Sequence, residues 1–386
     1  MIPRHAAPRI LRLLDGFPVV VVTGPRQSGK TTLVRALLAG RPYVSLESPS
    51  QREFARTNPA EFLRQFPQGA VIDEAQHAPE LFSEMQGVVD ATGRMGMFVL
   101  TGSQNLSLLS GVTQSLAGRS ALVELLPLSI AELSQAGLLR ADYASHLVSG
   151  FFPAIYSRSL DPYEWLQGYL VTYAERDARQ IAAIQDLSAF QRFLRLTASR
   201  TGQLLNLQSL ASDTGVSDKT IKHWLAVLET CYLVHYVRPH VANFGKRLIK
   251  MPKLYMTDVG LAAALIGIRD QSQVQNHPLR GALFETMVVN EFLKNRRNVG
   301  VRDQLYFWRD NIGTEVDLIL ERGTEIAAVE IKSGPTVSAD AFGNLKKWQR
   351  YAAERGSFSA VYPGLVYGGD TRFVRDGVDV MPWARI

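Results

Sequence analysis

Residues 19–31 decide the fold, and they read Val19-Val20-Val21-Val22-Thr23-Gly24-Pro25-Arg26-Gln27-Ser28-Gly29-Lys30-Thr31. An apolar run leads directly into the pattern Gly-x-x-x-x-Gly-Lys-Thr, which is typical of a phosphate-binding loop between a buried strand and a helix. Gly24 and Gly29 permit the bend that turns backbone N–H groups inward around an anion. The first turn of the following helix adds the positive end of its dipole. The stretch therefore predicts a nucleotide-phosphate site, with a chance glycine turn as the alternative.

The polar side chains of this loop have distinct expected roles. Lys30 is expected to reach the β- and γ-phosphates and to act in catalysis, and the Thr31 hydroxyl is expected to hold Mg²⁺. The residues expected to contact the nucleotide are Gly24, Gln27, Ser28, Gly29, Lys30, Thr31, Thr32 and Ser103.

A second apolar strand, Val71-Ile72, ends in the acidic pair Asp73-Glu74. Asp73 is expected to hold Mg²⁺ directly or through water, and Glu74 is expected to orient or deprotonate the attacking water. Gln76 and His77 follow and are expected along the same edge. The alternative is that the acidic pair is simply a turn at the end of a strand.

Polar residues also follow the next strand, in Leu100-Thr101-Gly102-Ser103-Gln104. Either Ser103 or Gln104 is expected to sense the γ-phosphate, and a helix N-cap is the alternative. Arg119 is a candidate for stabilising transition-state charge, within its own chain or across a subunit interface. A plain surface or structural arginine is the alternative there.

Residues 1–135 alternate short apolar runs with helical patterns. Buried strands are expected at 18–22, 43–46, 70–72, 97–100 and 121–125, with helices near 30–38, 59–65 and 79–90. This alternation predicts a parallel sheet with helices on both faces. Ser129 then offers an N-cap for the next helix.

The composition is that of a globular protein, because 46% of the 386 residues are hydrophobic and 20% are charged. The single cysteine, Cys231, excludes an intramolecular disulfide and indicates a reducing compartment. No apolar run approaches the roughly 18 residues that a membrane helix needs. The valine run enters a glycine-rich loop without a signal-peptide cleavage site, so a cytoplasmic location without membrane contact is expected.

The net charge of +6 is concentrated in one segment. Residues 191–253 contain ten basic and three acidic residues, an excess of seven positive charges. A concentrated basic block is the expected footprint of a polyanionic partner. A solvated basic face is the alternative, and charge alone does not distinguish the two.

A helix-turn-helix pattern lies within this basic segment, at 207–221. Ala211 is small where two helices cross, Gly215 falls in the turn, and Ser217 can cap the second helix. The residues expected to contact nucleic acid, most simply DNA, are Lys219 and Lys222 on that helix and Lys246 and Arg247 in a wing. A module that only packs or binds a protein is the alternative.

The C-terminal part contains an acid–acid–lysine set. Asp317 and Glu330 are expected on adjacent strands, where they bracket a divalent metal. Lys332 lies on the same strand face as Glu330, and Glu285 on the preceding helix is a fourth member. This is the pattern of metal-dependent nucleases. The alternative is a nuclease-type fold retained for binding, with the charges forming a buried ion cluster.

Together these motifs resemble the bacterial and archaeal AAA-type P-loop ATPases that carry a C-terminal domain of unknown function with a nuclease-like fold. The resemblance spans essentially the whole chain. It implies Mg²⁺-dependent ATP binding and hydrolysis, and a winged-helix segment between the two ends. The chain departs from the pattern at Val316, where nuclease-like relatives have proline, and at Ser103-Gln104, where many AAA-type proteins have asparagine. The stretches that carry the resemblance are 24–32, 71–76, 100–104, 116–119, 127–129, 176–177, 253–261, 281–285, 307–309, 315–317 and 330–332.

We therefore predict an α/β protein in three parts. These are a P-loop, parallel-sheet ATPase domain at 1–135, a helical and winged-helix region at 136–265, and a restriction-endonuclease-like α/β domain at 266–386. The main functional prediction is an ATPase that couples nucleotide state to nucleic-acid binding. An ATP-gated nuclease and an ATP-dependent switch for a protein partner remain open. A homo-oligomer is also expected, since AAA-type sites often form between subunits.

Overall fold

The computed structural model describes residues 2–103, 115–174, 184, 186–240, 250–301, 305–355 and 358–386. The chain divides into two compact units. Unit 1 comprises Met1–Leu128, Thr230–Tyr232 and Asn295–Val301, and unit 2 comprises Ser129–Glu229, Leu233–Lys294 and Arg302–Ile386. Unit 2 thus includes most of both the predicted central region and the predicted C-terminal domain. The three-part division at 135/136 and 265/266 stays a prediction.

Unit 1 has a five-stranded sheet in the order β2-β3-β4-β1-β5, and every neighbouring pair is parallel. This confirms the parallel sheet expected from the alternating pattern. Its strands are β1 (Val19–Thr23), β2 (Tyr43–Ser45), β3 (Ala70–Asp73), β4 (Phe98–Gly102) and β5 (Ser120–Glu124). Its helices are α1 (Ala7–Gly16), α2 (Lys30–Leu37), α3 (Pro49–Thr57), α4 (Pro59–Arg64), α5 (Glu80–Thr92) and the 3₁₀ turn Ala75–His77.

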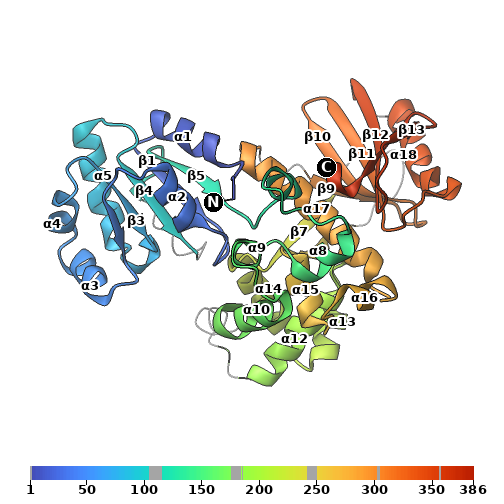
Figure 1. Cartoon of the computed structure of the whole chain (residues 1–386), viewed down its shortest axis with the longest axis horizontal. Coiled ribbons are helices and arrows are strands. Elements are labelled where there is room, and N and C mark those ends of the chain that lie inside the picture. The colour runs from blue at the N-terminus through green and yellow to red at the C-terminus, as the bar shows by residue number, and fades with distance from the viewer. Residues whose placement is uncertain are drawn as a thin grey trace. The chain divides into compact units, whose positions relative to one another are not determined.

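Helices cover both faces of this sheet, as Figure 1 shows. Val19 and Val21 pack with apolar side chains of α3, α4 and α5, whereas Val20 and Val22 pack with those of α1 and α2. Side chains alternate along a strand, so a strand covered on both faces needs an uninterrupted apolar run. Each of these fully buried valines stabilises the fold by roughly 1.5–3 kcal/mol. The same packing fixes where β1 ends and its loop begins.

The helices of unit 2 begin with α7 (Ile130–Gln135). Ser129 accepts a hydrogen bond from the backbone N–H of Glu132, and the Glu132 carboxylate accepts one from the backbone N–H of Ser129, so the predicted N-cap is confirmed as a capping box. Within the described residues, no helix is long and apolar enough to cross a membrane. The helices that follow are α8 (Tyr143–Ser149), α9 (Pro153–Ser157), α10 (Pro162–Tyr169), the π-helical turn Leu170–Ala174, α12 (Leu187–Ser199), α13 (Leu207–Thr214), α14 (Asp218–Thr230), α15 (Val259–Leu265), α16 (Gln271–Gln275), α17 (Arg280–Val299) and α18 (Gly343–Arg355), with 3₁₀ turns at Ala339–Phe342 and Trp383–Arg385.

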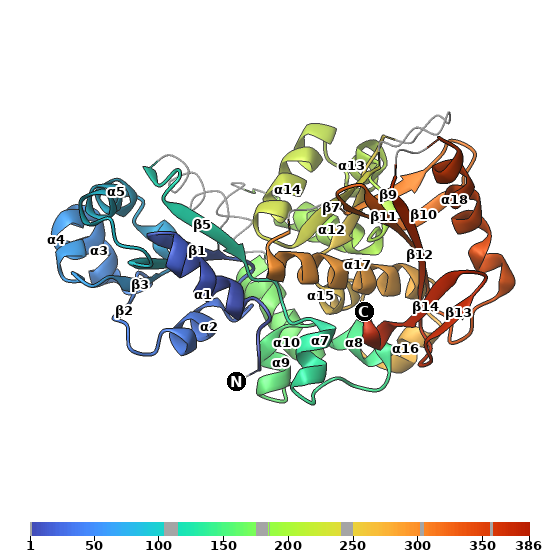
Figure 2. The same ribbon diagram turned by 90° about the horizontal axis from the view of Figure 1, so that it is seen from above.

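A nine-stranded sheet runs through unit 2 in the order β13-β14-β12-β11-β10-β9-β7-β8-β6. Strands β7 and β9 pair in parallel, so the sheet continues across the boundary predicted at 265/266. Helix α18 packs against β10, β11 and β12 on the outer part of the sheet (Figure 2). The strands are β6 (Gln203–Leu204), β7 (Val234–Pro239), β8 (Lys253–Met256), β9 (Leu305–Arg309), β10 (Glu315–Arg322), β11 (Glu325–Lys332), β12 (Ala360–Tyr367), β13 (Phe373–Arg375) and β14 (Val378–Pro382).

Candidate nucleotide site and carboxylate cluster

The loop after β1 has the backbone shape that its glycines predict. Gly24 has a φ of +141°, and a Cβ there would lie 2.2 Å from the carbonyl oxygen of Leu125. Gly29 has a φ of 92° and is the N-cap of α2. Gln27 also takes a positive φ of 62°, which is uncommon for a side chain other than glycine. Strand and helix packing therefore hold a strained loop at the carboxyl end of β1.

Lys30 lies inside this loop. Its Nζ donates hydrogen bonds to the carbonyl oxygens of Gly24 at 3.0 Å and Pro25 at 2.8 Å. The side chain is buried, and burial lowers the pKa of its ammonium to about 8, although Glu74 and Asp73 act in the opposite direction. A buried cation with only carbonyl partners in the loop is well placed to gain energy from an incoming anion.

Asp73 at the end of β3 accepts hydrogen bonds from three hydroxyl groups. Thr31 Oγ1 lies 2.9 Å from Oδ1, Tyr43 Oη lies 2.8 Å from Oδ2, and Thr101 Oγ1 also donates to Oδ1. The structure therefore brings together Thr31 and Asp73, the pair predicted to hold Mg²⁺. Burial and the bond to Asp73 raise the pKa of Tyr43 to about 12, so this hydroxyl remains a donor.

Glu74 follows with a left-handed φ of 54°, which turns it out of the strand direction. Its Oε2 accepts hydrogen bonds from Gln76 Nε2 and, at 3.1 Å, from Ser103 Oγ. Among the described residues, Gln76 Oε1 is buried without a hydrogen-bond partner, while its Nε2 donates to Glu74. Ser103 thus lies beside Glu74, whereas Gln104, the other residue considered for the sensing role, lies outside the described residues.

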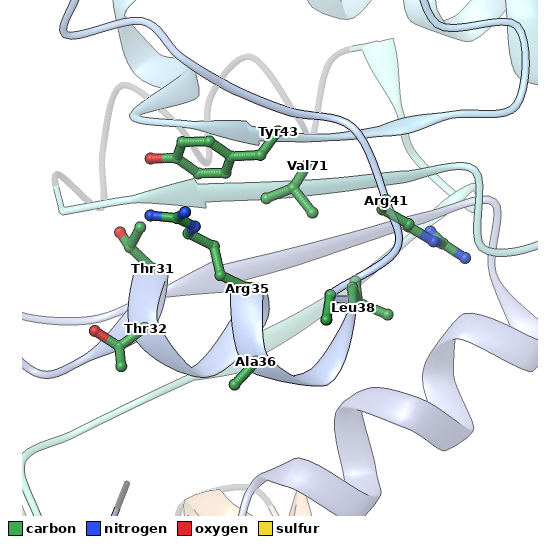
Figure 3. Close-up of a pocket in the computed structure, with 9 residues that line it drawn as sticks. Thr31, Thr32, Arg35, Ala36, Leu38, Arg41, Tyr43 and Val71 are labelled. Atoms are coloured by element: carbon green, nitrogen blue, oxygen red, sulfur yellow. The ribbon is translucent and has the colours of Figure 1, made fainter.

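A groove of about 510 Å³ opens beside α2 and the edge strand β2 (Figure 3). The Arg35 guanidinium lies over the Tyr43 ring, 4.8 Å from its centroid. Thr31 and Thr32, both expected to contact the nucleotide, line the same groove. The Mg²⁺-binding edge expected from the sequence is therefore open to solvent on this side.

Arg119 lies at the other edge of the sheet. Its carbonyl oxygen accepts a hydrogen bond from the backbone N–H of Val19, at the start of β1, whereas the phosphate loop follows Thr23 at the strand's end. That separation is roughly 13 Å along the strand. The guanidinium forms a two-pronged ion pair with Asp90, at 2.5 and 2.8 Å. In this structure the Arg119 guanidinium is therefore paired with Asp90 and away from the phosphate loop. A role within its own chain stays a prediction. A role across a subunit interface stays a prediction.

The predicted helix-turn-helix corresponds to α13 and α14. Gly215 between them has a φ of 81°, and Ser217 Oγ accepts a hydrogen bond from the backbone N–H of Thr220 at 3.1 Å. The apolar side of α14 is buried, and Lys219 and Lys222 are exposed on its other side. Strands β6, β8 and β7 are neighbours in the sheet, with β8 in the middle. The other two predicted nucleic-acid contacts, Lys246 and Arg247, lie outside the described residues.

Four acidic side chains of unit 2 form a second site, which we call the carboxylate cluster: Glu285, Glu315, Asp317 and Glu330. Lys332 Nζ lies 2.6 Å from Glu330 Oε1 and 4.0 Å from Asp317 Oδ2. All four residues of the predicted nuclease set thus lie in one place. Burial, followed by the charge of Asp317, raises the pKa of Glu330 to about 8, and burial also raises the pKa of Glu285.

Lys253 of β8 also enters this cluster, which the sequence did not predict. Its Nζ lies 2.9 Å from Glu285 Oε1, 2.6 Å from Glu315 Oε1 and 4.0 Å from Asp317 Oδ1. Among the residues that the structure describes, no group of three or more His, Cys, Asp or Glu side chains has an arrangement that could hold a metal ion. The carboxylates are gathered around an ammonium group.

Comparison with known proteins places the chain in a family. It is 32% identical over 365 residues to the uncharacterized proteins Rv2008c of Mycobacterium tuberculosis and Mb2031c of Mycobacterium bovis, and each match covers 94% of this chain and 80% of the relative. The chain belongs to the family of these two proteins. An AAA domain matches residues 16–134, and domains of unknown function, DUF8612 and DUF4143, match residues 140–272 and 280–386. Unit 1 is therefore an AAA-type P-loop ATPase domain that binds ATP.

Two solved structures show distant similarity to this chain. The Walker-type ATPase PABY2304 of Pyrococcus abyssi has a TM-score of 0.47 and 16% identity, covering 69% of this chain and 96% of that one. AMPPCP-bound DnaA of Aquifex aeolicus has a TM-score of 0.30 and 14% identity, covering 58% of this chain and 85% of that one.

Sequence reasoning missed three residues of this ATPase that contact the predicted sites. Thr101 is a polar residue in an otherwise apolar buried strand, which is a usable signal of a polar partner. Tyr43 gives no such signal, because tyrosine is ordinary in an edge strand. Lys253 stands before the apolar residues of β8, and a buried lysine in a strand requires an anionic partner that only the fold identifies.

Proposed function

We propose that this ATPase requires Mg²⁺ and couples its nucleotide state to the binding of a nucleic acid, most simply DNA. The observation that carries the proposal is the exposed pair Lys219 and Lys222, on the second helix of a helix-turn-helix within a segment of seven excess positive charges. The proposed ATP hydrolysis is argued from the phosphate loop and the side chains that follow β3. The proposed nucleic-acid binding is argued from α13 and α14.

The residues at the end of β3 fit a Mg²⁺ ion. A hydroxyl and a carboxylate, Thr31 and Asp73, already lie 2.9 Å apart, and oxygen ligands of these kinds are those that Mg²⁺ prefers. Thr31 and Asp73 would hold the ion, which would offset the charge of the phosphate groups. Tyr43 and Thr101 keep the carboxylate in place by donating to its two oxygens.

Hydrolysis then depends on two charged side chains. Lys30 exchanges its loop carbonyl partners for phosphate oxygens, which stabilises the charge that develops on them. Glu74 orients the attacking water and accepts its proton. Gln76 and Ser103 both donate to Glu74 Oε2, so they set the direction in which that carboxylate points.

Nucleic-acid contact is assigned to α14. The order α12, β6, α13, α14, β7, β8, with β8 between β6 and β7, supports a winged-helix interpretation of this region. In that interpretation the second helix contacts bases or phosphates. Lys246 and Arg247, which lie outside the described residues, remain predicted contacts.

The test is a salt titration of DNA binding with matched variants. K219A/K222A removes two proposed phosphate contacts, so the slope of log K against log salt concentration should become about 1.8 less steep. The control K346A/K347A removes two exposed lysines from α18 and changes net charge equally. It should leave that slope within about 0.5 of wild type. Equal slopes in the two variants would exclude α14 as the binding surface.

The other two functions give different outcomes. Failure of the wild-type protein to bind DNA or RNA at low salt favours a switch that acts on a protein partner, since phosphate contacts must show salt dependence. The ATP-gated nuclease is the weaker alternative, because the Lys253 ammonium lies among the carboxylates that the metal would need.

A homo-oligomer remains part of the proposal. Arg119 in such an assembly acts on the nucleotide of a neighbouring subunit, which requires release of its ion pair with Asp90. ATPase activity per subunit that rises with protein concentration, and that R119A abolishes, supports this arrangement.

A further inference from the structure

The carboxylate cluster holds a buried cation from another part of the chain. Lys253 stands on β8, Glu285 on α17, and Glu315 and Asp317 on β10. The Lys253 ammonium contacts the first two carboxylates at 2.9 and 2.6 Å, and its side chain is only 4% exposed. Residues 315 and 317 point to the same face of β10, because side chains alternate along a strand. The Lys253 ammonium on β8 therefore links this strand to α17 and to β10 within unit 2.

This ammonium is firmly charged. Burial lowers the pKa of Lys253, but the neighbouring carboxylates of Glu285, Asp317 and Glu315 outweigh burial and raise it above its ordinary value. Tyr255, two residues along β8, adds a hydrogen bond to Glu285 Oε1 at 2.7 Å. The same β8 face thus supplies both a charge and a donor to the cluster.

Two further basic side chains contact the carboxylates of the cluster. Lys332 contacts Glu330, and Arg309 Nη1 lies 3.0 Å from Glu315 Oε2. Four carboxylates thus face three basic groups. Among the described residues, Glu330 Oε2 is buried without a hydrogen-bond partner, and burial raises the pKa of this side chain.

A divalent metal does not fit this arrangement. The oxygens of Glu285 and Glu315 are already 2.6–2.9 Å from Nζ, a typical charge-assisted hydrogen-bond distance. A metal at the same point would face an ammonium at contact distance, and the two positive charges would repel each other in a poorly solvated site.

We propose that the Lys253 ammonium is the resident cation of the carboxylate cluster, in the place that the nuclease interpretation gives to a divalent metal. A metal ion enters this cluster only when the ammonium is removed. The inference is independent of the proposed function, because it concerns neither ATP nor α14.

The test measures Mn²⁺ binding to the full chain without nucleotide, from the electron paramagnetic resonance signal of free Mn²⁺. Wild type and D317N should bind Mn²⁺ equally, since the cluster takes none. K253M should gain one Mn²⁺ with affinity at least tenfold above any wild-type binding, and K253M/D317N should lose it. K253R, which keeps the charge, should gain none.

Two results would overturn the proposal. The first is Mn²⁺ binding by wild type that D317N abolishes, because the metal then displaces Lys253. The second is a K253M protein with wild-type circular dichroism that gains no Mn²⁺. If K253M does not fold, the comparison of wild type with D317N decides alone, since it requires no change at Lys253.

Discussion

Replacing Gln76 with leucine tests whether the orientation of Glu74 matters for ATP hydrolysis, and it leaves the phosphate loop unchanged. The Gln76 amide donates to Glu74 Oε2, and its own Oε1 is buried without a partner. Leucine has a similar volume and lacks both polar groups. The substitution therefore removes one donor from the carboxylate and also removes one buried, unsatisfied acceptor.

The expected size follows from these contacts. A hydrogen bond to a charged group contributes roughly 1.5–3 kcal/mol. If the bond acts by directing Glu74 in the transition state, kcat falls roughly ten- to a hundredfold, since 1.36 kcal/mol is a factor of ten in rate. Ser103 still donates to the same oxygen, which favours the lower end of this range. The free energy of unfolding should change by less than about 1 kcal/mol, because loss of the bond and loss of the unsatisfied acceptor offset each other.

The assay is phosphate release as a function of ATP concentration, with urea unfolding of the same proteins. Q76L should lower kcat and leave KM within about twofold, because Gln76 contacts the Glu74 carboxylate, which we propose to be catalytic, and not the loop. The control Q86L makes the same exchange at a half-buried position on α5 and should behave as wild type. Wild-type kcat in Q76L, or a loss confined to KM, would refute the assignment of Gln76 as a positioning residue.

Three further predictions concern other parts of the chain. Y43F removes one of the hydrogen-bond donors to Asp73, so the Mg²⁺ concentration for half-maximal ATPase activity should rise by about tenfold. Y362F, which changes an exposed tyrosine, is the control. Equal Mg²⁺ dependence in the two variants would contradict the role of Tyr43 in positioning Asp73. Burial lowers the pKa of His146 to about 4, whereas its pKa in the unfolded chain is about 6.5. Between these pH values His146 is protonated in the unfolded chain and neutral in the folded chain. The free energy of unfolding, measured by urea unfolding, should therefore fall by up to roughly 3 kcal/mol from pH 6.5 to pH 4. H146Q should make this fall smaller, and the same fall in H146Q and wild type would argue against the contribution of His146. The wild-type protein should not cut supercoiled plasmid in the presence of Mg²⁺ or Mn²⁺, with or without ATP. Nicking by the wild type that is lost in D317N would contradict this prediction.

Much of the nucleotide site could be predicted because its signals are local. The Gly24 and Gly29 positions carry backbone angles that favour glycine, and the valines of β1 must be apolar where both faces of a strand are covered. Asp73 follows an apolar strand, and the carboxyl ends of parallel strands meet at one edge, so its approach to Thr31 follows from the alternating pattern. The exposed and buried sides of α14 follow from helical periodicity in the same way.

The sequence by itself determined the five parallel strands of unit 1, the phosphate loop after β1 and the turn at Gly215, because these depend on residues close together in the chain. Only the tertiary structure decided which strands lie next to each other. That order brings Tyr43 onto Asp73, joins β7 to β9, and carries Lys253 into the carboxylate cluster. It also leaves Arg119 beside the amino-terminal end of β1, whereas the phosphate loop follows the carboxyl-terminal end of that strand. The physical reason is that periodicity specifies which face of an element is buried, whereas partner choice depends on packing between segments far apart in sequence.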